Sequence, residues 1–91
     1  SPWKPAATVA AVVERDGRFL FVEEQTRDGL RINQPAGHLD PGESLVEACT
    51  RETLEETAHR FTPLQLLGVY LWRAGAQADA PAYLRFAFTG A

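Results

Sequence analysis

Residues 37–58 read GHLDPGESLVEACTRETLEETA, a loop containing glycine and proline followed by a glutamate-rich segment. Ser44 and Glu47 have the spacing of a capping box, in which the serine oxygen accepts an amide N–H three residues later and the glutamate accepts the serine N–H. The sequence therefore predicts a helix from Leu45 to about Ala58, a stretch without Gly or Pro.

Three glutamates, Glu52, Glu55 and Glu56, lie in the second half of this helix, on the side that Leu45 and Cys49 occupy in the first half. They repel one another and lie near the helix end that prefers cations. An all-oxygen cluster suits a hard divalent cation, Mg²⁺ or Mn²⁺. Taken alone, the segment is equally compatible with an ordinary glutamate-rich surface helix, since Glu is a good helix former.

Hydrophobic runs predict four strands, at residues 8–13, 19–24, 64–72 and 83–89. We expect the first two to pair antiparallel through a turn at Asp16 and Gly17, and the third to be buried and bulged at Gly68. The last strand alternates apolar and polar residues and is expected to be half-buried. Residues 33–43, with two Pro and two Gly, are expected to form a long structured loop.

The polar residues around the helix resemble the signature of the Nudix hydrolases. Gly37 is followed at the family spacing by Glu43 and then by RETLEETA at residues 51–58. The departures from the pattern are Thr53, Ala58 and His59. None of them removes a carboxylate. Further segments, at residues 3–5, 21–24, 33–39 and 83–86, resemble the branch of the family that removes phosphate from thiamine-type pyrophosphates and from nucleoside di- and triphosphates.

The resemblance implies an α+β fold, an α/β/α sandwich with a mixed sheet between helices, formed by residues 1–91 as a single domain. Members of the family add a C-terminal strand and helix that this chain lacks, so we expect one layer of the sandwich to be missing.

The resemblance also assigns the site. The metal ligands would be Glu52, Glu55, Glu56 and the backbone carbonyl of Ala36. Arg51 would pair with Glu43, and this pair with the three glutamates would form the catalytic set. The implied enzyme is a Mg²⁺-dependent pyrophosphohydrolase or phosphatase, with Mn²⁺ as a substitute, in which metal-activated water attacks a small diphosphate. The general base stays open between Glu52 and Glu56, and some members of the family use a carboxylate from a later loop instead.

Six further side chains are candidates for substrate contact, although surface solvation or packing accounts for each of them equally well. They are Arg27, Arg31, Asn33, His38, Trp72 and Arg85. A rival interpretation is a Nudix-like module that senses a nucleotide without cleaving it. Such modules typically lose the carboxylates that this chain keeps. An interaction domain with a vestigial signature is a third possibility.

Composition restricts the partners and the compartment. The 91 residues carry a net charge of −3, which argues against a general grip on nucleic acid. The single cysteine, Cys49, expected in the core, allows no internal disulfide and favours a reducing, cytoplasmic setting. The apolar run at residues 6–13 is too short to span a membrane. We expect a small-molecule diphosphate as partner, with monomer or homodimer left undecided.

Overall fold

The computed structural model describes residues 3–27, 29–77 and 79–91. Its elements are β1 (Ala6–Val12), β2 (Glu14–Arg15), β3 (Arg18–Phe19), β4 (Val22–Thr26), β5 (Gly29–Asn33), β6 (Ala36–His38), α1 (Leu45–Thr57), β7 (Pro63–Arg73) and β8 (Ala82–Gly90). The main sheet has the order β6-β1-β8-β7, and β2–β3 and β4–β5 form separate hairpins. Because β1 runs parallel to β8 while the other pairs are antiparallel, the predicted mixed sheet is confirmed.

Helix α1 begins at the predicted capping box. Ser44 Oγ accepts the Glu47 N–H at 3.1 Å, and the Glu47 carboxylate accepts the Ser44 N–H at 2.8 Å. The helix ends at Ala58, which has a left-handed φ of 59° and donates its N–H to the Leu54 carbonyl. A glycine adopts this conformation more easily, so Ala58 ends the helix at some cost in backbone strain.

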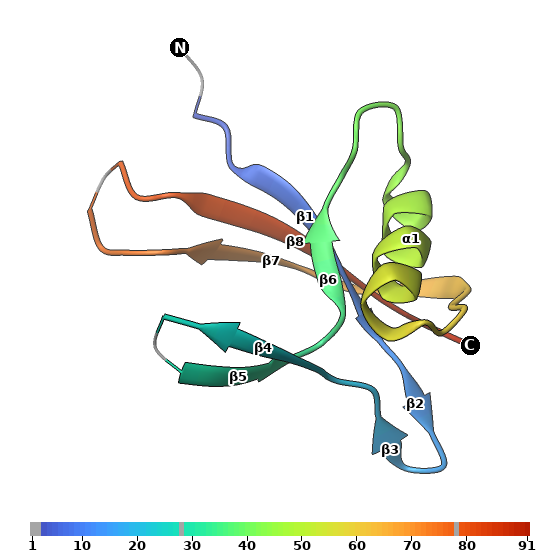
Figure 1. Cartoon of the computed structure of the whole chain (residues 1–91). Helices are drawn as coiled ribbons and strands as arrows, with labels where there is room; N and C mark the ends of the chain where they lie inside the picture. The colour runs from blue at the N-terminus through green and yellow to red at the C-terminus, as the bar shows by residue number, and fades with distance from the viewer. Residues whose placement is uncertain (1–2, 28, 78) are drawn as a thin grey trace.

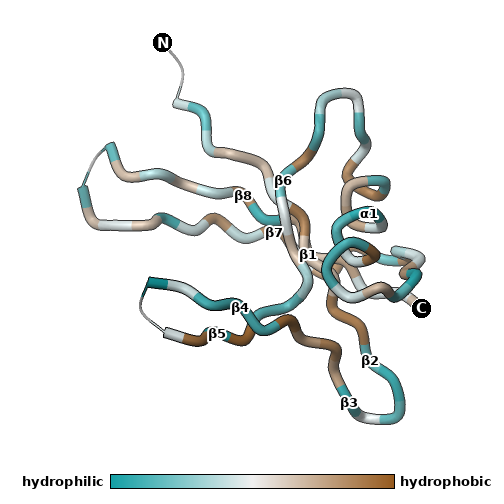
Figure 2. Tube along the Cα trace, in the orientation of Figure 1, coloured by the Kyte–Doolittle hydropathy of each residue, from teal (hydrophilic) through white to brown (hydrophobic). Residues whose placement is uncertain are grey.

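The hydrophobic core lies between α1 and the inner strands of the sheet (Figure 1). Its buried members are Val9, Ala11, Ala48, Cys49, Phe61 and Phe88. Figure 2 shows the hydrophobic stretch of β1 running through the middle of the molecule, with hydrophilic residues at the β2–β3 turn. Cys49 is buried, as expected, and burial raises the pKa of its thiol to about 11.

The buried stripe of α1 continues through Thr53, which donates its hydroxyl to the Cys49 carbonyl. The three glutamates lie beside this stripe, against the end of β6 and the loop that follows it. The expectation that all three share the buried side is wrong for Glu55 and Glu56, which are both exposed; the Glu55 side chain is 59% exposed. A threonine takes the core position because its methyl packs while its hydroxyl bonds within the helix.

Other strand predictions are wrong or hold only in part. The pairing of residues 8–13 with residues 19–24 forms only next to the turn at Asp16 and Gly17, where Glu14 pairs with Phe19 in β2 and β3 and the Leu20 N–H donates to the Val13 carbonyl at 3.0 Å. Strand β1 instead has β6 and β8 as neighbours, which suits a strand that is buried on both faces. Strand β6 forms inside the segment expected to be loop, and β5 forms at residues for which no strand was predicted.

Strand β7 has the predicted bulge, with register shifts between Pro63 and Gln65 and between Leu66 and Gly68. It is not buried, however: Leu71 and Trp72 are each 60% exposed. The physical reason is that β7 is the edge strand and α1 packs mainly against β6 and β1, so one apolar face of β7 has no cover. No helix in the described part of the chain is long and apolar enough to cross a membrane.

Candidate active site

Arg51, in the middle of α1, is the centre of a polar network. Its Nε and Nη2 atoms donate to the two carboxylate oxygens of Glu43 at 2.6 and 3.0 Å, so the expected pairing is present and bidentate. Nη2 also donates to the His38 carbonyl at 2.9 Å, at the end of β6. Nη1 donates to Glu52 at 2.5 Å and to Glu55 at 3.3 Å. The guanidinium therefore holds the loop, the strand end and two glutamates in one arrangement.

The electrostatic effect of this network is clearest at Glu43. The hydrogen bond from Arg51, together with the N–H of Asp40 at 2.8 Å, holds the pKa of the Glu43 carboxyl below its ordinary value. In turn, Glu43 and Glu52 raise the pKa of the Arg51 guanidinium. Glu43 thus acts as a fixed anion that positions Arg51.

Glu56 lies on the other side of the helix end, against β6. Its carboxylate accepts the Ala36 N–H at 2.8 Å. Burial raises the pKa of Glu56, the Ala36 N–H opposes this, and the charges of Glu52, Glu24 and Glu55 raise it further. Glu24, on β4, is a site residue that the sequence analysis did not propose, since only the β4–β5 hairpin brings it near the helix.

Gly37 lies so close to a side chain of α1 that a Cβ atom has no room there. A Cβ atom added at Gly37 would clash with the carboxylate of Glu52. Two carboxylates, those of Glu52 and Glu56, therefore reach the backbone of β6 at consecutive residues. Only a residue without a side chain at position 37 allows this approach.

The donor set fits a hard divalent cation in its chemistry. The carboxylates of Glu52 and Glu56 meet the peptide backbone of Ala36 and Gly37, so two acidic oxygen donors lie next to each other at the end of β6. Within the described ranges, however, no three His, Cys, Asp or Glu side chains stand close enough together to hold a metal ion. Arg51 draws Glu52 and Glu55 toward itself, so binding of a cation requires their carboxylates to turn.

A cavity of about 1210 Å³ opens beside these residues, between the β4–β5 hairpin and the main sheet. Ala36, Gly37 and Glu56 line one end of it. All six side chains proposed for substrate contact line it as well: Arg27, Arg31, Asn33, His38, Trp72 and Arg85. Strands far apart in the sequence thus bring together six residues that were each proposed separately for substrate contact.

Strand register arranges the cavity face of the sheet in three rows. The row nearest the glutamates is built of small residues: Ala36, Ala10, Ala87 and Gly68. The next row is polar: His38, Thr8, Arg85 and Tyr70. The third contains Tyr83 opposite Trp72. Because alternate residues of a strand share a face, the rows follow directly from the pairing.

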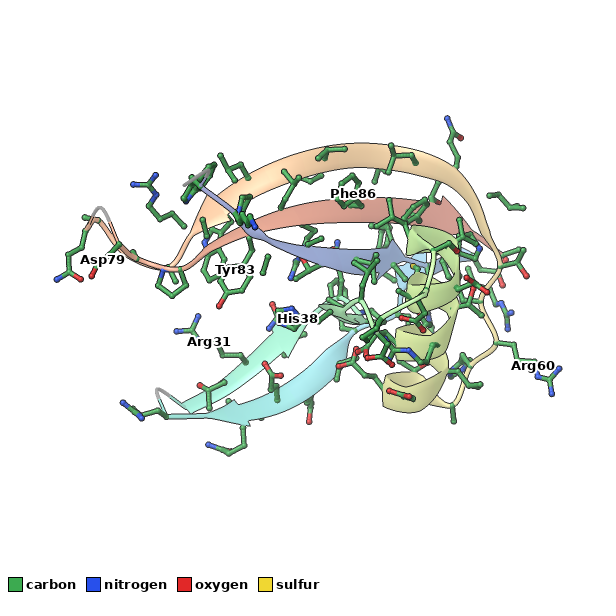
Figure 3. All side chains as sticks on the ribbon, turned by 90° about the horizontal axis from the view of Figure 1, so that it is seen from above. Arg31, His38, Arg60, Asp79, Tyr83 and Phe86 are labelled. Atoms are coloured by element: carbon green, nitrogen blue, oxygen red, sulfur yellow. The ribbon has the colours of Figure 1, made fainter. Side chains whose placement is uncertain are left out.

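The aromatic residues of the cavity contact one another. The rings of Trp72 and Tyr83 stack with centroids 5.2 Å apart, and His38 meets Tyr83 edge-on at 6.0 Å. In Figure 3, Arg31, His38 and Tyr83 lie on the two sides of the space between β5 and the sheet, whereas Arg60 points away from it. The sequence analysis missed Tyr83 and Tyr70, although the alternation of β8 places Tyr83 on the same face as Arg85.

Comparison with known proteins identifies the family. A model described as the NUDIX domain matches residues 2–89. The chain belongs to the Nudix family. It is 44% identical over 86 residues to the phosphatase NudJ of Escherichia coli (strain K12), and the phosphatase NudJ of Shigella flexneri matches equally. These matches cover 94% of this chain and 54% of the relatives, so the chain spans about half of their length.

Solved structures of Nudix proteins share the fold. A NUDIX hydrolase from Nitrosomonas europaea superposes with a TM-score of 0.86 at 52% identity, covering 96% of this chain and 58% of that one. A MutT protein from Methanosarcina mazei Go1 superposes with a TM-score of 0.79 at 27% identity, covering 100% of this chain and 67% of the other. The expected Nudix architecture is therefore confirmed.

Proposed function

We propose that this Nudix chain carries the metal site of a Mg²⁺-dependent pyrophosphohydrolase or phosphatase, with Mn²⁺ as a substitute, that cleaves a phosphoanhydride bond in a small diphosphate. The observation that carries the proposal is the convergence of Glu52 and Glu56 on the backbone of Ala36 and Gly37, at the end of a large cavity whose walls hold arginines. An acidic end for cations and a basic wall for phosphate suit a phosphorylated substrate.

Glu52, Glu55, Glu56 and the Ala36 carbonyl would hold the cation. When bound, it would neutralise phosphate oxygens and make a water molecule more acidic. Arg51 orients Glu52 and Glu55 and is itself fixed by Glu43, so this pair is proposed to position the ligands. The proton acceptor is Glu52 or Glu56.

The substrate is proposed to be a nucleoside di- or triphosphate or a thiamine-type pyrophosphate. Each of these carries an aromatic heterocycle as well as phosphates. The stacked rings of Trp72 and Tyr83 offer a surface for such a heterocycle, and Arg27, Arg31 and Asn33 face it from the hairpin side of the cavity. Both named relatives are phosphatases, which agrees with release of phosphate.

The test is Glu56→Gln, which keeps the size and the hydrogen-bond acceptor of the side chain but removes its charge. With Mg²⁺ and a panel of diphosphates, detecting phosphate and pyrophosphate separately, we expect turnover to fall by about 10²–10⁴-fold with the circular dichroism spectrum unchanged. Glu47→Gln, which retains the capping geometry, is the matched control. The proposal is refuted if full-length wild-type protein hydrolyses none of the diphosphates in the panel.

A nucleotide-sensing module without hydrolysis is the second candidate. The observation that favours it is the engagement of Glu52 and Glu55 by Arg51, with no ready three-carboxylate cluster in the described residues. Calorimetry in excess Mg²⁺ separates the two candidates, because a sensor binds the nucleotide without a continuing heat of reaction.

Several expectations remain proposals. The 91 residues are proposed to form one domain that lacks a further layer, supported by the exposed apolar face of β7. A cytoplasmic setting, with no nucleic acid or membrane as partner, is likewise proposed. Monomer and homodimer stay open.

A further inference from the structure

The polar row of the cavity contains an unsatisfied hydroxyl. Thr8 is 7% exposed, and its Oγ1 is a buried atom with no hydrogen-bond partner among the described residues. Thr8 lines the cavity and lies in register between His38 on β6 and Arg85 on β8. An unpaired buried hydroxyl destabilises the protein that holds it, so its persistence calls for a partner that the protein does not supply.

Arg85, next in the same row, is similarly unengaged. It is partly buried at the cavity wall, and no hydrogen bond or ion pair joins it to another residue in the described part of the chain. Arg51 offers the contrast, because its guanidinium binds three carboxylates and a carbonyl. A partly buried guanidinium without an acid is suited to bind an anion from outside.

The charges around the cavity support the same conclusion. Apart from Arg31, three arginines line it, Arg27, Arg73 and Arg85, against two glutamates, Glu24 and Glu56. Both glutamates act at the metal end, since the charge of Glu24 raises the pKa of Glu56. The polar row is two residues further along each strand than the row of small side chains, about 7 Å from it. The surroundings of the polar row are therefore basic, apart from the end of the cavity where Glu24 and Glu56 lie.

We propose that Thr8, His38 and Arg85 form an anion subsite that binds a phosphoryl group of the substrate outside the metal centre. A phosphoryl group presents several acceptor oxygens, which match the guanidinium fork, the hydroxyl and the imidazole in one row. The subsite rests on the proposed function for the identity of its substrate. The binding itself needs neither a cation nor hydrolysis.

The experiment is calorimetric titration of inorganic phosphate into the protein in the presence of EDTA. We expect wild-type protein to bind phosphate and Arg85→Gln to bind it at least tenfold more weakly. Arg60→Gln, which removes the same charge at a residue outside this cavity, should stay within twofold of wild type. The proposal is overturned if wild-type protein binds no phosphate at millimolar concentration, or if Arg85→Gln binds it as Arg60→Gln does.

Thr8 gives a second readout that loss of folding cannot imitate. Thr8→Val keeps the shape but removes the hydroxyl, so we expect weaker phosphate binding, by about three- to tenfold, with a thermal midpoint equal to or above that of wild type. Thr8→Ser, which restores a hydroxyl, should recover the affinity. Equal phosphate affinity in the valine and serine variants would remove Thr8 from the subsite.

Two anions have the chemistry that this subsite binds: a phosphoryl group of the substrate and free phosphate. If the subsite serves the substrate, inorganic phosphate inhibits hydrolysis competitively and Arg85→Gln raises KM more than it lowers kcat. Non-competitive inhibition would overturn the assignment to the substrate. Glu56→Gln keeps the two proposals apart, because it should abolish turnover while leaving phosphate binding in EDTA intact.

Discussion

In residues 36–58 the polar side chains form hydrogen bonds and ion pairs with one another. On β7 and β8, by contrast, the side chains that line the cavity make few such polar contacts. Arg51 is shared among Glu43, Glu52, Glu55 and the His38 carbonyl. On the sheet side, Trp72 is 60% exposed and Arg85 makes no hydrogen bond or ion pair with an acid within the described ranges.

This difference separates the two tasks of a Nudix site. The loop and helix carry their own counter-charges, so the Arg51–Glu43 pair is in place before any ligand arrives, while Glu52 and Glu55 would have to turn away from Arg51 to bind a cation. The cavity wall leaves aromatic and basic groups exposed, so it is suited to gain contacts when a substrate binds. Substitutions in the first region should therefore act on turnover and stability, and those in the second on substrate affinity.

The largest effect on turnover is expected at Arg51, the centre of the network in residues 36–58. Arg51→Lys keeps the charge but loses the planar fork that binds Glu43 in a bidentate manner. We expect kcat to fall by about 10- to 100-fold, with a lower thermal midpoint, because the glutamates proposed to hold the metal lose their positioning partner. Arg60→Lys is the control. Activity within twofold of wild type would show that the network does not position the site.

A smaller effect is expected at the cavity wall that β7 and β8 form. Trp72→Ala removes the ring that stacks on Tyr83, so we expect KM for an aromatic diphosphate to rise by about tenfold while kcat stays within threefold. Steady-state kinetics on the same substrate, with Trp3→Ala as control, measure this. An unchanged KM, or a loss confined to kcat, would place Trp72 outside the substrate contact.

The smallest effect concerns pH. Because Arg51 and the Asp40 N–H lower the pKa of Glu43 in the folded protein, Glu43 contributes stability above the ordinary carboxyl pKa of 4.5. That contribution is lost as the pH falls through the lowered value. We expect Glu43→Gln to reduce the drop in thermal midpoint between pH 6 and pH 3, whereas Glu14→Gln should not. Identical pH profiles for the two variants would contradict this account.

Much of the loop and helix could be predicted from the sequence because its determinants are local. The capping box, the start of α1, the Arg51–Glu43 pair and the turn at Asp16 each depend on residues a few positions apart. The end of the helix at Ala58 was also predicted, although its left-handed conformation was not.

Strand pairing could not be predicted in the same way. The run at residues 8–13 was rightly recognised as a strand, but its partners β6 and β8 are about 28 and 77 positions away in the chain, distances over which local patterns carry no information. For the same reason Glu24 and Tyr83 were missed as neighbours of the site. Strand β7 was misjudged because its hydrophobic composition says nothing about which layer covers it.

The sequence by itself determined the family, the helix with its three glutamates and the charge of the site, because these depend on residue type and short spacing. Only the tertiary structure decided that Glu52 and Glu56 approach Ala36 and Gly37, and that Thr8, His38 and Arg85 share one row. The physical reason is that register between distant strands fixes which side chains share a face, and register is set by packing of the whole sheet.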